Sequence, residues 1–235
     1  MDDQDASAYY ERGCAQQEQG NLQAAITDYD RALELRPTYA EALSGRGLAR
    51  QILGESDAAL EDVNRALKLN PQSVTAYRSR AEIHYAQRNL GEAIADCGRA
   101  IALDAGDARS YYCRGLAHFD KGDLQRAIDD LDVAIDRSTA KANLSLMARA
   151  HRQRGVAHAA GGDPEAAVVD YNRAIDLLPD GRGRATAYIH RGLARAAQGN
   201  LERAIADFGL ALALLPEEKA HDADRARAHV HRGAT

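Results

Sequence analysis

The chain has 235 residues, of which 45% are hydrophobic and 28% are charged, and its net charge is −5 with neutral histidines. This composition is typical of a folded globular protein and excludes disorder as the default state. General nucleic-acid binders are normally basic, so the acidic balance argues against that class of partner.

No apolar run approaches the length of about 18 residues that indicates a membrane-spanning helix. The opening residues Met-Asp-Asp-Gln-Asp are acidic, whereas a secretory signal begins with a basic segment. We therefore expect a cytoplasmic protein that does not bind membranes.

The residue types also limit the kind of core. Two Phe and no Trp stand beside a large number of alanines, which favours helices brought close together by small side chains. The three cysteines, Cys14, Cys97 and Cys113, show no CxxC spacing. They indicate free thiols and neither a disulfide framework nor a zinc cluster.

A short motif that ends in Arg-Gly recurs along the chain. It reads Ala-Tyr-Tyr-Glu-Arg-Gly at 8–13, Ala-Leu-Ser-Gly-Arg-Gly at 42–47 and Ser-Tyr-Tyr-Cys-Arg-Gly at 110–115. A variant copy occupies 76–81, and two later copies end at Gly155 and Gly192. A polar turn and a second helix-periodic segment, such as 24–33, follow each copy. The pattern predicts six units of two amphipathic helices each.

The spacing of small residues in these units resembles the tetratricopeptide repeat, which has a period of 34 residues. Small residues at repeat positions 8, 20 and 27 carry the resemblance: Gly13, Gly47, Ala81, Gly115, Gly155 and Gly192; Ala25, Ala59, Ala93, Ala127, Ala167 and Ala204; and Ala32, Ala66, Ala100, Ala134, Ala174 and Ala211. The resemblance covers nearly the whole chain. It implies an all-α fold, a right-handed α-solenoid of antiparallel helix pairs in which neighbouring repeats bury one another's apolar faces.

The repeat spacing divides the chain into blocks. It stays regular over 6–139, which holds four repeats, and lengthens over 140–216, which holds two. We expect helix extension at 140–147 and a loop at 181–183. Residues 217–235 begin a seventh repeat or form a capping helix, and because that repeat stops short, we expect a longer protein with further repeats or an effector domain.

Each unit has an Arg before the repeat Gly and an Asp sixteen residues later. The pairs are Arg12 with Asp28, Arg46 with Asp62, Arg80 with Asp96, Arg114 with Asp130, Arg154 with Asp170 and Arg191 with Asp207. Arg suits bidentate contact with a carboxylate, so we predict ion pairs that join the two helices of a repeat, or one repeat to the next. A charged track for a ligand is the alternative. Loss of one partner from a desolvated pair costs about 3–5 kcal/mol.

Three histidines, His84, His118 and His158, occupy the same position in consecutive units. A metal ladder is the alternative to half-buried packing, and we favour packing because adjacent repeats are too far apart for bonds of about 2 Å to one ion. No nucleophile, base and oxyanion donors occur together in a recognisable motif. We expect no enzymatic activity, no cofactor and no metal.

In the resembled family, first-helix residues line a concave groove. Tyr and Arg are enriched where protein interfaces concentrate binding energy. We expect a peptide-binding site at the centre of the groove, formed by Arg78, Tyr85, Arg109, Tyr112, Leu116, Phe119, Arg149 and Arg152. The alternative is that the arginines are solvated or paired with Glu82 and Asp120.

The predicted function is therefore a non-enzymatic scaffold that binds a protein or peptide of acidic and hydrophobic character. Family members that hold the acidic C-terminus of heat-shock chaperones use a Lys, Asn and Arg clamp. The corresponding residues here do not match, so we do not expect that activity: they are Tyr10, Cys14, Leu48, Thr75 and Ser79.

Two rival functions stay open. The repeats could be the regulatory or sensor segment of a larger enzyme or effector protein. Nucleic-acid binding by the groove arginines would show a steep salt dependence. The frequent Ala, Arg and Asp suggest a bacterial origin.

Overall fold

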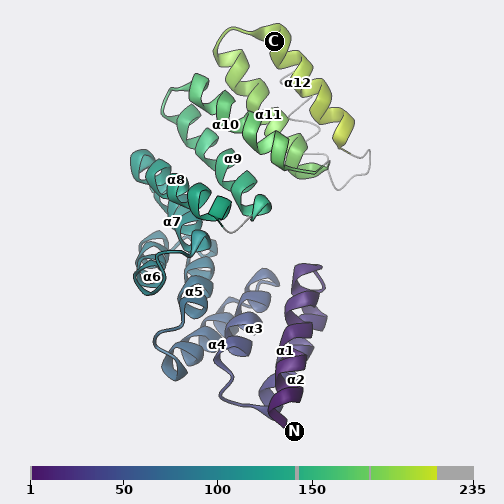
Figure 1. Ribbon diagram of the computed structural model, residues 1–235, viewed down its shortest axis with the longest axis vertical. Coiled ribbons are helices and arrows are strands. Elements are labelled where there is room, and N and C mark those ends of the chain that lie inside the picture. Colours follow the sequence, from purple (N-terminus) through teal and green to yellow (C-terminus); the bar gives the residue numbers. More distant parts are fainter. Residues whose placement is uncertain (1, 141–142, 180, 216–235) are drawn as a thin grey trace. The chain divides into compact units, whose positions relative to one another are not determined.

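The computed structural model describes residues 2–140, 143–179 and 181–215, and in these residues twelve helices follow one another in antiparallel pairs (Figure 1). The all-α fold of paired helices is confirmed. The first helices of the pairs are α1 (Asp2–Glu18), α3 (Ala40–Ile52), α5 (Val74–Ala86), α7 (Ala108–Asp120), α9 (Leu144–Ala160) and α11 (Arg182–Ala197). The second helices are α2 (Leu22–Leu35), α4 (Ser56–Leu69), α6 (Leu90–Leu103), α8 (Leu124–Ala140), α10 (Pro164–Leu177) and α12 (Leu201–Leu214).

The chain divides into two compact units, residues 1–117 and 118–235. In the first unit, α2 packs against α1 and α3, and α4 packs against α3 and α5. The first helices also contact one another in order, α1 with α3 and α3 with α5. In the second unit, α9 packs against α8 and α10, and α11 packs against α10 and α12. Helices α2, α4 and α10 are thus each covered on one side by their own first helix and on the other by the first helix of the next repeat.

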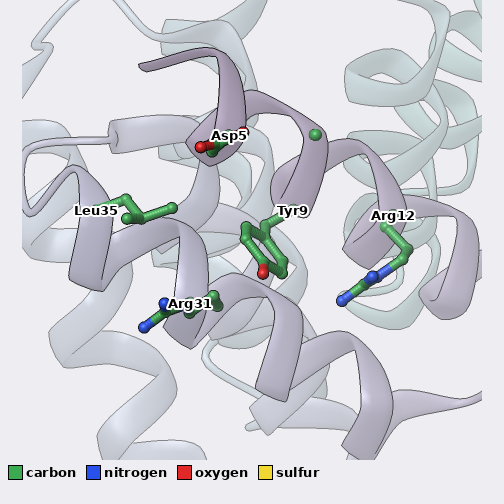
Figure 2. A pocket seen from close by; sticks show the side chains of 6 residues that line it. Asp5, Tyr9, Arg12, Arg31 and Leu35 are labelled. Atoms are coloured by element: carbon green, nitrogen blue, oxygen red, sulfur yellow. The ribbon is translucent and has the colours of Figure 1, made fainter. Parts of the chain in front are cut away.

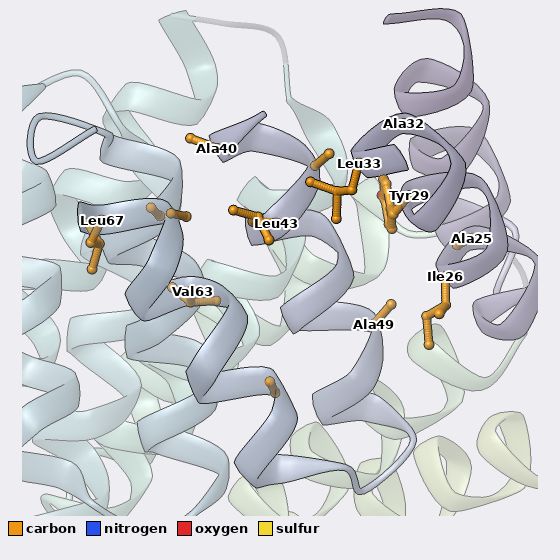
Figure 3. Close-up of a cluster of buried hydrophobic side chains, with 14 of the residues drawn as sticks. Ala25, Ile26, Tyr29, Ala32, Leu33, Ala40, Leu43, Ala49, Val63 and Leu67 are labelled. Carbon is orange, nitrogen blue, oxygen red and sulfur yellow. The ribbon is translucent and has the colours of Figure 1, made fainter. Parts of the chain in front are cut away.

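The core of the first unit combines a few large side chains with many alanines (Figure 3). Leu43 and Val63 are fully buried, and Tyr29 is 1% exposed. Ala25 and Ala59, at a repeat position predicted to be small, have no exposed surface. Small side chains let the helix axes approach, so that one stripe of large residues per helix fills the space between them.

The repeat glycine is required by a large residue opposite it. A Cβ atom on Gly13 would lie 2.7 Å from the Tyr29 ring, and one on Gly192 would lie 2.6 Å from the Phe208 ring. In the third repeat Ala81 replaces the glycine, and it packs in a cluster with the small side chain of Cys97. The close approach of the paired helices is therefore preserved by matched size within each repeat.

The connections between the later repeats differ in part from expectation. Helix α8 reaches Ala140 and α9 begins at Leu144, after Asn143 accepts a hydrogen bond from the Leu146 N–H at 3.1 Å. Helix extension is confirmed at 140 and 144–147 and is wrong at Asn143, which precedes the first turn of α9, while residues 141–142 lie outside the described chain.

The loop predicted at 181–183 is wrong for its last two residues. Arg182 and Gly183 form the first turn of α11, because Gly181 turns the chain at φ 128° and its carbonyl accepts from the Ala185 N–H. The predicted seventh repeat at 217–235 lies outside the described residues.

Candidate functional site

The recurring Arg and Asp residues form bidentate ion pairs between the two helices of a repeat. In five repeats the Arg Nε and Nη2 atoms donate to the two Asp oxygens at 2.5 to 3.0 Å. All six aspartates are buried, with exposed fractions from 1% to 6%. The sixth pair of positions, Arg114 and Asp130, is divided between the two units.

The same arginines also join neighbouring repeats. Their Nη1 atoms donate to an Asp or Asn on the second helix of the preceding repeat. The pairs are Arg46 with Asp30 at 2.5 Å, Arg80 with Asn64 at 2.8 Å, Arg154 with Asp132 at 2.5 Å and Arg191 with Asn172 at 2.6 Å. The predicted Arg and Asp pairs therefore join the two helices of one repeat, and the bonds to the preceding repeat use acceptors that the sequence analysis did not predict.

The three recurring histidines face these buried aspartates. His84, His118 and His158 each place Nε2 3.9 Å from a carboxylate oxygen, on Asp96, Asp130 and Asp170 in turn. In the second repeat Arg50 occupies the same position and donates to Asp62 at 2.7 Å. These side chains therefore lie beside the interior ion pairs of the repeats.

A groove of about 320 Å³ opens on the first helices of the first unit. Its residues come from α1, α3 and α5, with Arg109 from α7 and Tyr29 from α2. The full lining is Tyr10, Cys14, Gln17, Glu18, Tyr29, Glu41, Gly45, Leu48, Ile52, Thr75, Arg78, Ser79, Glu82 and Arg109.

Aromatic residues form one end of this groove. The ring of Tyr10 lies 6.1 Å from that of Tyr29 and 5.1 Å from that of Tyr39. Tyr29 donates its hydroxyl to Gln17 Oε1 at 2.9 Å. Burial, aided by the neighbouring Cys14 thiol, raises the pKa of both Tyr10 and Tyr29, so they remain neutral donors. The Ile52 side chain, which also lines the groove, is 59% exposed and offers apolar surface to a ligand.

The charges in the groove have both signs. Arg78 donates from Nη1 to both oxygens of Asp107 at 2.9 and 3.0 Å, and its side chain is 16% exposed. Arg109 lines the same groove and is exposed. Three carboxylates, Glu18, Glu41 and Glu82, also line the groove. It is therefore not a uniformly basic track.

The eight residues predicted to contact a ligand do not all lie together. Arg78 and Arg109 line the groove, whereas Tyr112 is only 8% exposed and belongs to the packing of the first unit. Tyr85 and Leu116 are half-buried in the first unit. Phe119, Arg149 and Arg152 belong to the second unit, where Arg149 is exposed and the other two are half-buried.

The predicted site contained only Arg78 and Arg109 of the lining, and it missed the other residues, among them Tyr29, Leu48 and Ile52. Ile52 lies four residues after Leu48, and this spacing puts both on one helical face. That signal was available in the sequence. The exposure of Ile52, which makes it useful for binding, was not.

The second unit has an apolar pocket of its own, with a volume of about 480 Å³. Its lining comes from α9, α10 and α11 and consists of Val156, Ala159, Gly162, Pro164, Tyr171, His190, Leu193, Ala194 and Ala197. The Tyr171 and His190 rings lie 5.6 Å apart. Burial raises the pKa of Tyr171, and the charge of Arg152 opposes this shift.

Comparisons with known proteins agree with this architecture. Two family models, both described as Tetratricopeptide repeat, match the chain, one at residues 6–39 and the other at 50–108, 98–143 and 112–182. A search of curated proteins found no match. None of the described helices is long and apolar enough to cross a membrane.

Solved structures are similar in fold at low identity. A chain of the APC/C hetero-tetramer Cut9-Hcn1 matches with 21% identity and a TM-score of 0.81, over 95% of this chain and 42% of that one. The pilF protein of Pseudomonas aeruginosa matches with 16% identity and a TM-score of 0.74, over 96% and 98%. YrrB matches with 22% identity and a TM-score of 0.53, over 78% and 91%. This chain thus spans less than half the length of the Cut9-Hcn1 chain.

Proposed function

Because the chain belongs to the tetratricopeptide-repeat family, whose members generally serve as protein-interaction scaffolds, we propose that it binds a peptide or helix of a partner protein in the groove of its first unit. The observation that carries the proposal is the juxtaposition of exposed apolar Ile52 and half-buried Leu48 with Arg78 and Arg109. Such a mixture of apolar, aromatic and Arg side chains favours a peptide over a small polar metabolite.

The charges of the groove narrow the expected ligand. An acidic side chain of the ligand pairs with Arg78 and Arg109, and an apolar side chain packs on Leu48 and Ile52. Because three glutamates also line the groove, a run of several acidic residues would be repelled. We propose a ligand with an isolated acidic residue beside apolar ones.

YrrB, a similar structure, is described as a TPR protein with an unusual peptide-binding site. That description supports peptide binding as a use of this fold. We extend the proposal to the second unit, where the pocket around Tyr171 supplies apolar surface and Arg149 and Arg152 of α9, which do not line that pocket, supply charge. The chain is proposed to act without catalysis, as an interaction scaffold.

The alternative is a regulatory segment of a larger enzyme or effector. It is favoured by one observation, that the Cut9-Hcn1 chain continues well beyond the part this chain matches. A binding assay with this chain tests the groove for both functions, because a scaffold and a regulatory segment would each bind a peptide or helix there.

Selection from a displayed library of random peptides tests the groove directly. Selected peptides are expected to bind the full chain with dissociation constants of about 1 μM, as for a preformed groove of modest size. Cys14 lines the groove and is half-buried, so bound peptide should protect its thiol from a labelling reagent. Saturating peptide that leaves the labelling rate unchanged would place the binding elsewhere.

Matched variants locate the contact. Arg109→Glu and Ile52→Glu change exposed side chains of the groove and should weaken binding by at least about tenfold. Lys68→Glu makes the same charge change as Arg109→Glu on an exposed residue of α4 that does not line the groove, and it should leave the affinity unchanged. Equal affinity for the groove variants and the wild type would refute the proposed site.

A further inference from the structure

A second surface, separate from the groove, lies on the outer face of the first repeat. Figure 2 shows this pocket, which has a volume of about 470 Å³ and is lined by Asp5, Ala8, Tyr9 and Arg12 of α1 and by Arg31 and Leu35 of α2. None of these residues lines the groove. Tyr9 lies between two cations, with its ring centre 5.0 Å from the Arg12 guanidinium and 6.0 Å from that of Arg31.

The equivalent face of the second repeat is buried. Ala42 and Leu43, which correspond to Ala8 and Tyr9, have no exposed surface, and the side chain of Arg46 is 15% exposed. Helix α2 covers this face of α3. In the first repeat, by contrast, the side chain of Arg12 is 60% exposed. The pocket is therefore the surface that takes a second helix elsewhere in the chain.

The ion pairs show which chemistry this surface takes. Arg46, Arg80, Arg154 and Arg191 each donate Nη1 to an Asp or Asn of a preceding helix. Arg12 donates Nε and Nη2 to Asp28, as its counterparts do, and no described residue accepts a hydrogen bond from its Nη1. The exposed Arg31 adds a second positive charge, which is paired with Glu34 at 2.5 Å, and Asp5 adds a negative charge to the lining. A hydrogen-bond acceptor from a partner would give Arg12 Nη1 the bond that Nη1 of Arg46, Arg80, Arg154 and Arg191 makes to the preceding repeat.

We propose that this outer face binds an amphipathic helix of a second protein, one that carries a carboxylate opposite Arg12. Helix α2 shows how the contact residues of such a helix are spaced. Its Ile26 and Leu33 pack in the core shared with α3, and its Asp30 accepts a hydrogen bond from Arg46. The partner helix thus presents an apolar residue, an acidic residue four positions later and an apolar residue three positions after that. These three side chains share one helical face.

A second copy of this chain fits the surface less well. The last described second helix, α12, has Gly209 at the position that corresponds to Asp30. Head-to-tail stacking of α12 on α1 would therefore bring no acceptor to Arg12. Charge complementarity instead favours a different protein with an acidic helix.

A synthetic peptide tests the proposal on the full chain. The probe is a stapled helix of residues 22–35 with Asp28→Ser. This change removes the carboxylate that pairs with Arg12 within the repeat, so that the peptide does not displace α2 from its own place against α1. Its matched control carries Asp30→Ala as well. The probe should bind in the micromolar range and weaken as salt is added, whereas the control should bind at least about tenfold more weakly and depend less on salt. Equal binding of the two peptides, or no binding at about 1 mM, would overturn the proposal.

Variants of the chain separate this surface from the groove. Arg12→Gln would also break the ion pair with Asp28. The better variants are Ala8→Glu and Arg31→Glu, because both change exposed residues. Each should weaken binding of the probe by at least about tenfold, whereas Arg109→Glu in the groove should not change it. Loss of probe binding in Arg109→Glu, with Ala8→Glu unaffected, would place the peptide in the groove and refute the outer-face site.

Discussion

Arg46 holds Asp62 through two hydrogen bonds, from Nε to Oδ2 at 2.8 Å and from Nη2 to Oδ1 at 2.5 Å. Its Nη1 reaches back to Asp30 of the first repeat at 2.5 Å. One side chain thus ties three helices, α2, α3 and α4. Because this arrangement recurs, the ion pairs hold the repeats in register as well as closing each helix pair.

Loss of the buried carboxylate of this network should lower the free energy of unfolding far more than loss of the exposed one. Asp62 is 5% exposed and accepts from Arg46 and Arg50, so Asp62→Ala leaves two cations partly buried and should cost about 3–5 kcal/mol of unfolding free energy. Asp30 has a side chain that is 45% exposed, and Asp30→Ala should cost at most about 1 kcal/mol. Thermal melts followed by circular dichroism measure both. Equal losses would mean that burial does not set the strength of the pairs.

The close approach at the repeat glycine predicts a steric effect. Gly192→Ala places a Cβ atom 2.6 Å from the fully buried Phe208 ring and should cost about 1–3 kcal/mol by overpacking. Gly209→Ala is the control on α12, because a Cβ atom there would meet nothing within 4 Å and alanine favours a helix by about 1 kcal/mol. Urea unfolding should therefore shift in opposite directions for the two variants. If Gly192→Ala were instead more stable than the wild type, α11 and α12 would have moved apart at no cost, and the overpacking account would be wrong.

Arg88 has a left-handed backbone at a turn position where each of the other five repeats has glycine. Its φ is 63°, whereas Gly20, Gly54, Gly122, Gly162 and Gly199 have φ between 76° and 89°. A side chain in this region costs about 1–2 kcal/mol, and glycine loses more chain entropy on folding, so Arg88→Gly should stabilise by about 0.5–1 kcal/mol. Gly122→Ala, the reverse change in the next repeat, should destabilise. A lower melting temperature for Arg88→Gly would contradict this account.

The stability of the second unit should fall in acid. Burial of Asp170 opposes its ionisation, but hydrogen bonds from His151 and Arg154 outweigh burial and hold the pKa below its usual 3.8. A lowered folded pKa gives stability that is present above the unfolded pKa, about 3.9, and is lost as pH falls through the folded value.

The matched variant for this pH effect is Asp170→Asn, which is less stable at pH 7 but cannot titrate. Its melting temperature should fall less steeply than that of the wild type between about pH 5 and pH 2. Parallel profiles for the two proteins would assign the acid sensitivity to other carboxylates.

The three thiols should differ in reactivity. Cys97 is fully buried, and its contact with Cys113 together with burial raises its pKa well above the usual 9.0. Cys113 is 4% exposed, whereas Cys14 is half-buried in the groove. Because the thiolate is the reactive form, a thiol reagent at pH 8 should modify Cys14 first and the other two only after unfolding. Rapid modification of Cys97 in the native protein would contradict this packing.

The repeat, its period and the pairing of Arg with Asp sixteen residues later all follow from the amino-acid sequence alone. These features could be predicted because they are local. A period of small residues follows from the helical geometry of one unit, and each repeat supplies an independent copy of the same signal. The Arg46 and Asp62 pair was visible in this way before any helix was placed.

Which of the predicted site residues are exposed, buried or ion-paired depends instead on the packing of the folded chain. Arg78 is held by Asp107, Tyr112 is buried and Ile52 is exposed, because each depends on how the next helix packs. The second acceptor of Arg46, Asp30, likewise comes from the preceding repeat. Burial and charge at a surface depend on contacts between helices distant in the chain, and a periodic pattern that recurs in every repeat carries no information about what differs between them.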